Sequence, residues 1–252
     1  MSRQNRKNTC MMTVFFAGLL LIGGGYVLLQ GARLRENAGS WLGAALLTLP
    51  VVLWRIVLAF PKEPGELPQL FFPGLANRLT IFRGLILCIL AGFLALNMPE
   101  GGLAWIPGLL FIAALILDGL DGYAARLRNE TSSFGAFLDP DLDAMGTLIG
   151  TLIAIRYGRL PGWYFLAGMA YYVFVFGRWM RKRRGLPLCP LPDRNDRRLA
   201  SVLQSVFISL ALLPGLPLPM TGMPAALVMI PVLAGFIRDW RTVTGYTPSG
   251  PP

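Results

Sequence analysis

Apolar stretches of about 20 residues recur along the chain, separated by short segments with charged residues, Gly and Pro. A helix needs about 20 predominantly apolar residues to cross a bilayer, whereas a membrane barrel would show short segments of alternating polarity. These stretches do not alternate, so each is expected to form a membrane-spanning α-helix. We expect eight spans, at residues 11–30, 41–60, 79–97, 103–126, 135–156, 161–180, 199–214 and 221–239.

The predicted fold class is therefore an all-α integral membrane protein, with two N-terminal spans ahead of a six-helix block. Residues 1–69 comprise a basic segment, two spans and a Pro-rich linker, residues 70–241 form a six-span core, and residues 242–252 form a cytoplasmic tail. The first run is long and lacks a clear small-residue cleavage pattern, so it is interpreted as a retained span. Arg55 lies inside the second run and either snorkels to an interface or marks a shorter, tilted helix.

Composition supports the membrane interpretation and narrows the chemistry. The 252 residues are 54% hydrophobic and only 14% charged, whereas a soluble domain carries about 25% charged residues. Histidine is absent, which excludes His triads, His-liganded metals and a His general base and leaves acid–base work to Asp, Glu or a less usual group. The cysteines Cys10, Cys88 and Cys189 are far apart and match no metal or disulfide spacing.

The net charge of +10 follows the expected topology. If the N-terminus is cytoplasmic, 17 of the 23 Lys and Arg residues fall on the cytoplasmic side, as the positive-inside rule requires. The excess charge then suits anionic lipid head groups, and no nucleic-acid partner is expected. We predict a multi-pass protein whose N-terminus and acidic cluster both face the cytoplasm.

Six of the thirteen acidic residues lie within residues 118–143. Asp118 and Asp121 are three apart at the end of one span, and Asp139 and Asp143 are four apart at the start of the next, so each pair shares a helix face. A short loop makes the two helices antiparallel neighbours, and the two pairs can converge. Four close carboxylates would repel one another without cations between them, and such hard oxygen ligands suit Mg²⁺ or Mn²⁺.

A purely structural interpretation covers part of this cluster. Asp139 before Pro140 can act as an N-cap followed by an N1 proline, and Asp141 would complement the helix dipole. Asp141 is expected to point away from its two acidic neighbours. The interpretation does not explain Asp118 and Asp121, because acids are disfavoured at the C-terminal end of a helix.

The complete pattern resembles a known signature. It reads Asp118-x2-Asp121-Gly122-x2-Ala125-Arg126-x8-Gly135-x3-Asp139-x3-Asp143. It is similar, at all eight specified positions, to the signature of the CDP-alcohol phosphotransferase family. The resemblance extends from about residue 70 to residue 241, and the first two spans lie outside it.

The resemblance implies an activity and a site. Members of this family transfer a phospho-alcohol group from a CDP-linked donor to an acceptor hydroxyl and release CMP. It implies a two-metal site for Mg²⁺ or Mn²⁺ and a homodimer. The implied metal ligands are Asp118, Asp121, Asp139 and Asp143, with Asp143 also the general base. The residues implied to accommodate the nucleotide are Gly122, Ala125, Arg126 and Gly135.

Two further segments bear on the substrates. Asn77, Thr80 and Arg83 resemble the Asn-x-Leu-Thr-x-x-Arg segment of bacterial phosphatidyltransferases that use CDP-diacylglycerol, although a helix start with snorkelling arginines would look the same. Arginines at the cytoplasmic ends of two later spans suit a phosphorylated acceptor, because guanidinium groups bind phosphate in a bidentate manner. The candidate acceptor-binding residues are Arg178, Arg197, Arg198, Ser201 and Gln204.

Arg198, Ser201 and Gln204 resemble only part of the Lys-x-Lys-Thr-x-x-Gln segment of phosphatidylglycerophosphate synthases. Ala200 replaces its second lysine, and Ala144 follows the expected base where that subfamily usually has lysine. Both departures remove positive charge from the expected acceptor site.

The leading hypothesis is a bacterial inner-membrane phosphatidyltransferase that uses CDP-diacylglycerol, with glycerol 3-phosphate as first-choice acceptor and inositol phosphate as second. A related alternative takes a CDP-linked small alcohol as donor and a lipid such as diacylglycerol as acceptor. A divalent-cation transporter is a third possibility, although the acids lie at one surface rather than at the midplane where transporter sites usually lie. A non-catalytic lipid-binding scaffold is the last.

Overall fold

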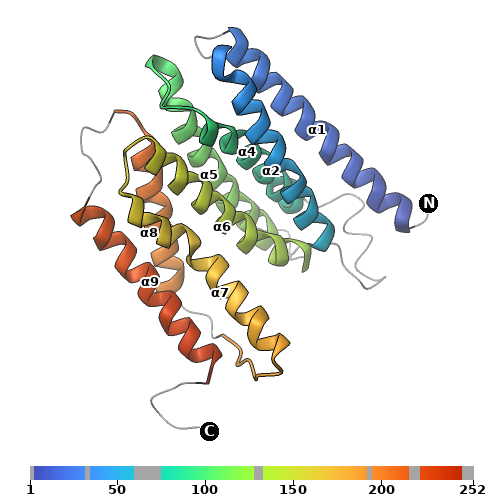
Figure 1. The fold of residues 1–252 in the computed structure, drawn as a ribbon. Helices are drawn as coiled ribbons and strands as arrows, with labels where there is room; N and C mark the ends of the chain where they lie inside the picture. Colours follow the sequence, from blue (N-terminus) through green and yellow to red (C-terminus); the bar gives the residue numbers. More distant parts are fainter. Residues whose placement is uncertain are drawn as a thin grey trace. The chain divides into compact units, whose positions relative to one another are not determined.

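The computed structural model describes residues 3–31, 35–59, 75–127, 133–191, 195–215 and 222–245. Within these ranges the chain forms eight α-helices and short 3₁₀ turns, with no β-strand, which confirms the predicted all-α class. Each helix overlaps one of the eight predicted spans, with ends that differ from the predicted ones by several residues (Figure 1). The Pro-rich linker that follows the second helix lies outside the described residues.

The chain divides into two compact units, Met1–Ile149 and Gly150–Pro252, with the division inside one helix. The first unit holds α1 (Arg3–Gly31), η1 (Arg35–Asn37), α2 (Ala38–Ala59), α4 (Leu75–Gly92), η3 (Phe93–Ala95), η4 (Gly101–Trp105), α5 (Ile106–Leu127) and the first part of α6 (Ser133–Arg156). The second unit holds the rest of α6, then η5 (Gly162–Tyr164), α7 (Phe165–Arg183), α8 (Asn195–Leu212) and α9 (Met223–Val243).

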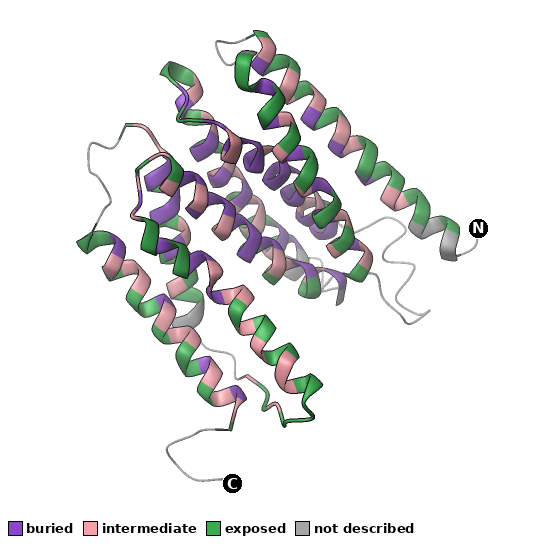
Figure 2. Ribbon diagram, viewed as in Figure 1, coloured by how far each residue is buried: buried purple, intermediate pink, exposed green. Residues whose placement is uncertain are grey.

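Helix α4 is the core of the first unit. It packs against α1, α2 and α5. Of its most apolar stretch, 61% is buried inside the protein, compared with 22% for α1 and 28% for α2. Figure 2 shows this contrast as a mostly buried α4 beside an α1 with a largely exposed surface.

Glycines allow the N-terminal helices to approach α4 closely. A Cβ on Gly25 of α1 would meet the Trp41 ring of α2 at 2.6 Å, and one on Gly92 of α4 would also collide with the Trp41 indole. Trp41 is 1% exposed and packs edge-on against Phe93, with ring centroids 6.2 Å apart. Small residues of this kind are typical of helix interfaces in membranes, so α1 and α2 form an integral part of the first unit.

Outward-facing apolar side chains indicate contact with lipid. Leu20 and Leu47 are each 77% exposed, and Leu28 is 76% exposed. Large exposed apolar surfaces mark interaction sites such as membranes. Five described segments are long and apolar enough to cross a bilayer, namely Asn8–Gly31, Ala38–Ala59, Leu75–Ala95, Gly101–Ala124 and Met223–Val243. The chain is therefore a multi-pass membrane protein, while crossing by α6, α7 and α8 stays a prediction.

Aromatic contacts and two hydrogen bonds to backbone carbonyls stabilise the second unit. Phe174 of α7 packs against Phe236 and Trp240 of α9, with ring centroids 6.0 and 6.2 Å apart. After α6, Arg159 donates hydrogen bonds to the carbonyls of Ala211 at 3.3 Å and Leu213 at 2.6 Å. These carbonyls are at the C-terminal end of α8, where helix carbonyls lack partners within the helix, so Arg159 fixes this end of the helix.

The structural interpretation of Asp139 and Pro140 as the start of a helix is wrong. Asp139 and Pro140 do not begin a helix, because α6 already starts at Ser133 and contains Pro140 in its interior. Asp139 is therefore not an N-cap, and Asp141 does not serve a helix start. The preceding residues 133–138 prolong the helix on the side of the loop.

Candidate functional site

Three buried polar residues occur on successive turns of the predominantly apolar α4. Asn77 is 4% exposed, and Thr80 and Arg83 are each 2% exposed. Burying a charged group without a partner is costly, and an ionisable residue inside a membrane span tends to mark function. Arg83 must therefore find counter-charges on neighbouring helices.

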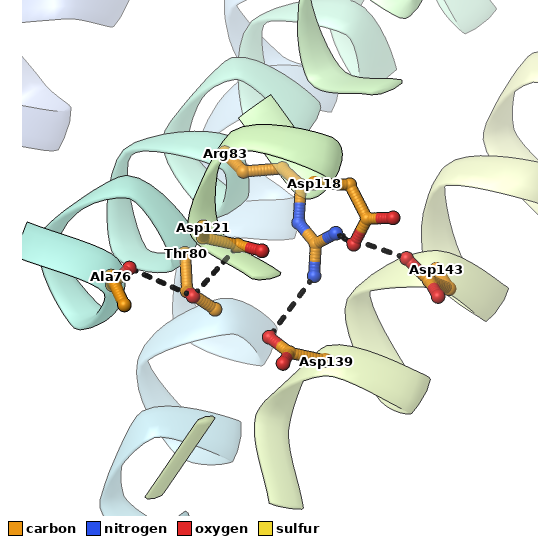
Figure 3. Close-up of polar contacts among 7 residues, drawn as sticks. All are labelled: Ala76, Thr80, Arg83, Asp118, Asp121, Asp139 and Asp143. Atoms are coloured by element: carbon orange, nitrogen blue, oxygen red, sulfur yellow. Dashed lines mark hydrogen bonds and ion pairs between the residues drawn. The ribbon is translucent and has the colours of Figure 1, made fainter. Parts of the chain in front are cut away.

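Arg83 is the centre of the acidic cluster (Figure 3). Its Nη1 pairs with Oδ1 of Asp118 from α5 and lies 3.1 Å from Oδ1 of Asp143 on α6, while its Nη2 lies 3.3 Å from Oδ1 of Asp139. Three carboxylates from two helices thus converge on one guanidinium. The convergence predicted from the spacing is confirmed, with a side chain of α4 between the acids.

Asp121 joins the same group through Thr80. The Thr80 hydroxyl lies 2.9 Å from Oδ2 of Asp121 and 3.1 Å from the carbonyl oxygen of Ala76, one helical turn earlier (Figure 3). Asp121 is 4% exposed, so its carboxylate is held deep in the helix interface. Helix α4 therefore supplies contacts to all four predicted ligand residues.

The cluster has a buried side and an open side. The Arg83 side chain is 3% exposed, whereas the side chains of Asp118, Asp139 and Asp143 are 40%, 37% and 49% exposed. The Arg83 guanidinium is therefore the buried part of the cluster, and the three carboxylates form an accessible layer over it. A solute can thus reach the carboxylates without displacing the helices.

The donor set suits a divalent cation. Four carboxylates carry four negative charges, and the ion pairs among the described residues give the cluster one guanidinium as its counter-charge. Hard oxygen ligands of this kind are those that Mg²⁺ and Mn²⁺ prefer. In the described conformation no three acidic or cysteine side chains are arranged as a ready metal site, because the carboxylates are turned toward Arg83.

The residues implied to accommodate the nucleotide lie beside this cluster in sequence. Gly122 follows Asp121 on α5, and Gly135 is one turn before Asp139 on α6. Ala125 and Arg126 belong to α5, but their side chains lie outside the described residues. Their roles stay predictions.

The candidate acceptor residues belong to the second unit. Arg178 is exposed on α7 with its guanidinium 5.9 Å from the centre of the Phe174 ring. Arg198 and Ser201 are exposed on α8, and Gln204, three residues further, is buried at 6% exposure. The side chain of Arg197 lies outside the described residues.

An ion pair that does not involve Arg83 was not predicted from the sequence. Arg55 of α2 pairs with Oδ2 of Asp141 on α6, so it does not merely snorkel to an interface. Asp141 does point away from its two neighbours, as expected. An arginine in one apolar run and an unassigned aspartate in another were the available signals, but nothing in their spacing connects them.

Comparison with known proteins places this site in a family. Residues 74–237 match the sequence model described as CDP-alcohol phosphatidyltransferase. A CDP-diacylglycerol–glycerol-3-phosphate 3-phosphatidyltransferase of Wigglesworthia glossinidia brevipalpis is 35% identical over 79 residues, which cover 31% of this chain and 42% of the relative. Cholinephosphotransferase 1 of Danio rerio is 25% identical over 186 residues, covering 69% of this chain and 46% of the relative.

A third type of relative also matches. A bifunctional IPC transferase and DIPP synthase of Thermococcus kodakarensis is 26% identical over 169 residues, covering 58% of this chain and 38% of the relative. The chain thus spans less than half the length of each of these curated relatives. No solved structure matches the chain significantly.

Proposed function

Because the chain belongs to the CDP-alcohol phosphatidyltransferase family, we propose that it is a membrane phosphatidyltransferase that transfers the phosphatidyl group of CDP-diacylglycerol to a hydroxyl of a polar acceptor. The observation that carries this proposal is the convergence of the signature aspartates of α5 and α6 on the buried Arg83 of α4. The reaction releases CMP.

The reaction needs a base for the acceptor hydroxyl, and Asp143 is the proposed one. Its side chain is 49% exposed, the largest exposure among the three carboxylates that contact Arg83, so an acceptor can reach it. Asp143 accepts the hydroxyl proton, the acceptor oxygen bonds to the donor phosphorus, and the bond from that phosphorus to CMP breaks. General bases of this kind contribute about 10²–10⁴-fold to a rate.

The other residues of the cluster orient the reactive groups. Asp118, Asp121, Asp139 and Asp143 are the proposed ligands for two divalent cations, which when bound neutralise phosphate charge and align the attack. Arg83 fixes the directions of three of these carboxylates, and Thr80 fixes Asp121.

For the acceptor we propose glycerol 3-phosphate first and inositol phosphate second, with Arg178, Arg197 and Arg198 as phosphate-binding residues. The glycerol-3-phosphate 3-phosphatidyltransferase supports this choice, because its sequence identity to the chain is higher than that of the cholinephosphotransferase. A second candidate pairs a CDP-linked small alcohol with a lipid acceptor. It is favoured by the longer alignment with the cholinephosphotransferase and by the uncharged, buried Ala144.

We further propose that the protein is a homodimer of the bacterial inner membrane, with its N-terminus and active site facing the cytoplasm. The distribution of Lys and Arg supports this orientation, and the family resemblance suggests the dimer. Labelling of the exposed Cys189 from one side of sealed vesicles tests the orientation, and light scattering in detergent tests the dimer.

One assay tests the reaction. The purified full chain is assayed in detergent with Mg²⁺ or Mn²⁺, and CMP release is measured. In one arm the substrates are CDP-diacylglycerol and a panel of polar acceptors. In the other arm they are a CDP-linked alcohol and diacylglycerol. We expect CMP only with CDP-diacylglycerol, and a loss of about 10²–10⁴-fold in Asp143→Asn.

Glu100→Gln is the matched control, because it removes a carboxylate from an exposed loop position. It should leave the rate unchanged. CMP from the CDP-linked alcohol alone would establish the second candidate, and a wild type silent with every CDP donor would reject the enzyme. Passage of Mn²⁺ across the membrane by such a silent protein would favour a transporter.

A further inference from the structure

Helix α6 carries three aspartates at alternate positions within two turns. Asp139 and Asp143 contact Arg83 of α4, and Asp141 contacts Arg55 of α2. Two residues correspond to about 200° around an α-helix, so Asp141 is on the face opposite its two neighbours. The same segment of α6 is thus held on opposite faces by arginines from two different helices.

Arg55 engages α6 at two points. Its Nη2 pairs with Oδ2 of Asp141, and its guanidinium carbon lies 5.4 Å from the centre of the Phe137 ring. Phe137 and Asp141 are four residues apart and therefore share a face of α6. The Asp141 side chain is only 13% exposed and that of Arg55 is 33% exposed, so solvent screens this pair less than a pair on an open surface.

Helix α2 packs closely against α4, the helix that carries Arg83. A Cβ on Gly84 of α4, the residue after Arg83, would lie 3.0 Å from Val52 of α2 and 3.6 Å from Leu142 of α6. The three helices α2, α4 and α6 therefore meet around Gly84. Val52 is 0% exposed and precedes Arg55 by three residues, so Arg55 extends from a rigidly packed part of α2.

We propose that Arg55 is a positioning residue for the candidate active site: by holding Asp141 and Phe137 it sets the rotation of α6 that presents Asp139 and Asp143 to the cluster. Helix α2 lies outside residues 74–237, which match the family. This chain therefore uses a helix outside the family domain to orient the proposed metal ligands. The inference rests on the proposed function of that cluster.

The experiment uses the full-length protein and two readouts besides activity. Binding of Mn²⁺ to the substrate-free protein is measured by electron paramagnetic resonance, and the unfolding temperature is measured in the same detergent. Turnover and the KM for the CDP-linked donor are measured in parallel. The variants are Arg55→Met, Asp141→Asn, the double variant, and Arg55→Lys, which keeps the charge.

We expect Arg55→Met and Asp141→Asn each to weaken Mn²⁺ binding by about tenfold, or about 1.4 kcal/mol. Turnover falls, while the KM for the donor changes little, because Arg55 acts through its contacts with Asp141 and Phe137 of α6. The double variant should be no worse than the poorer single variant, since both changes remove one interaction. Arg55→Lys should recover most of the Mn²⁺ affinity.

Leu49→Ala is the matched control, because it removes buried packing of α2 against Gly18 of α1 without changing any charge. It should lower the unfolding temperature and leave Mn²⁺ affinity unchanged. The proposal is overturned if Leu49→Ala weakens Mn²⁺ binding as much as Arg55→Met at an equal loss of stability. It is also overturned if Arg55→Met binds Mn²⁺ like the wild type, or if the wild type binds none.

The outcomes separate this proposal from the proposed function. A wild type that releases no CMP from any donor, yet loses Mn²⁺ affinity in Arg55→Met and Asp141→Asn, rejects the phosphatidyltransferase and supports the positioning role. An active wild type with unaffected Arg55 and Asp141 variants rejects only the positioning role.

Discussion

Removing the charge of Arg83 should strengthen divalent-cation binding and weaken catalysis. Arg83 lies among the carboxylates of Asp118, Asp139 and Asp143 and is itself 3% exposed in its side chain. A cation bound by these carboxylates is repelled by the guanidinium and competes with it for the same oxygens. In Arg83→Met the repulsion and the competition both disappear, whereas the carboxylates lose the partner that orients them.

The magnitude follows from charge and exposure. A divalent cation and a guanidinium 4 Å apart repel each other by about 8 kcal/mol at an effective dielectric constant of 20 and by about 2 kcal/mol in water, twice the values for two unit charges. Since the three carboxylates are 37–49% exposed, we take the lower limit, about 2 kcal/mol. This corresponds to roughly thirtyfold tighter Mn²⁺ binding in the variant.

Titration of the substrate-free protein with Mn²⁺, followed by electron paramagnetic resonance, measures this effect. Arg83→Lys keeps the charge and should bind Mn²⁺ like the wild type, and Arg241→Met removes an equal charge from an exposed position on α9 and should change nothing. Weaker Mn²⁺ binding in Arg83→Met would refute the reasoning, because it would show that orientation of the carboxylates outweighs repulsion by the guanidinium.

Three further changes test other parts of the structure. Thr80→Val removes the hydroxyl that contacts the buried carboxylate of α5 and should reduce CMP release about tenfold, since hydrogen bonds to charged groups contribute about 1.5–3 kcal/mol. Gly92→Val forces a side chain into Trp41 and should lower the free energy of unfolding by about 1–3 kcal/mol, whereas Gly24→Val, with open space around it, should not. Arg198→Gln should raise the KM for a phosphorylated acceptor about tenfold, the equivalent of about 1.4 kcal/mol, and leave the KM for an unphosphorylated acceptor unchanged.

The helices and the acidic cluster were predictable from the sequence for simple physical reasons. A bilayer requires apolar runs of fixed length, so the runs indicated the helices directly. Aspartates at spacings of three and four must share a helix face, and the short connection between α5 and α6 brought both faces together. Asp118 and Asp143 therefore fell into one cluster without any knowledge of packing.

The partners of these aspartates were less predictable. Which residue of α4 faces the cluster depends on the rotation and depth of that helix, and apolar residues on nearly all sides of α4 leave no amphipathic pattern to show it. The interpretation of Asp139 and Pro140 as a helix N-terminus failed, because α6 begins at Ser133, close to the predicted residue 135, and continues through both residues. Arg55 and Asp141 are 86 positions apart, and their pairing depends on the packing of α2.

The charge of the site explains why a cation is needed in the proposed reaction. The chain as a whole carries a net charge of +10, yet its accessible acidic layer of Asp118, Asp139 and Asp143 covers a buried guanidinium. The pyrophosphate of a CDP-linked donor is anionic and would be repelled by that layer, so the single charge of Arg83 does not suffice to hold it. Under the proposed function, divalent cations held by the carboxylates would reverse the sign of the surface that the phosphates meet. The two arginines then have separate tasks: Arg83 orients the carboxylates from within the site, and Arg55 holds α6 from its opposite face.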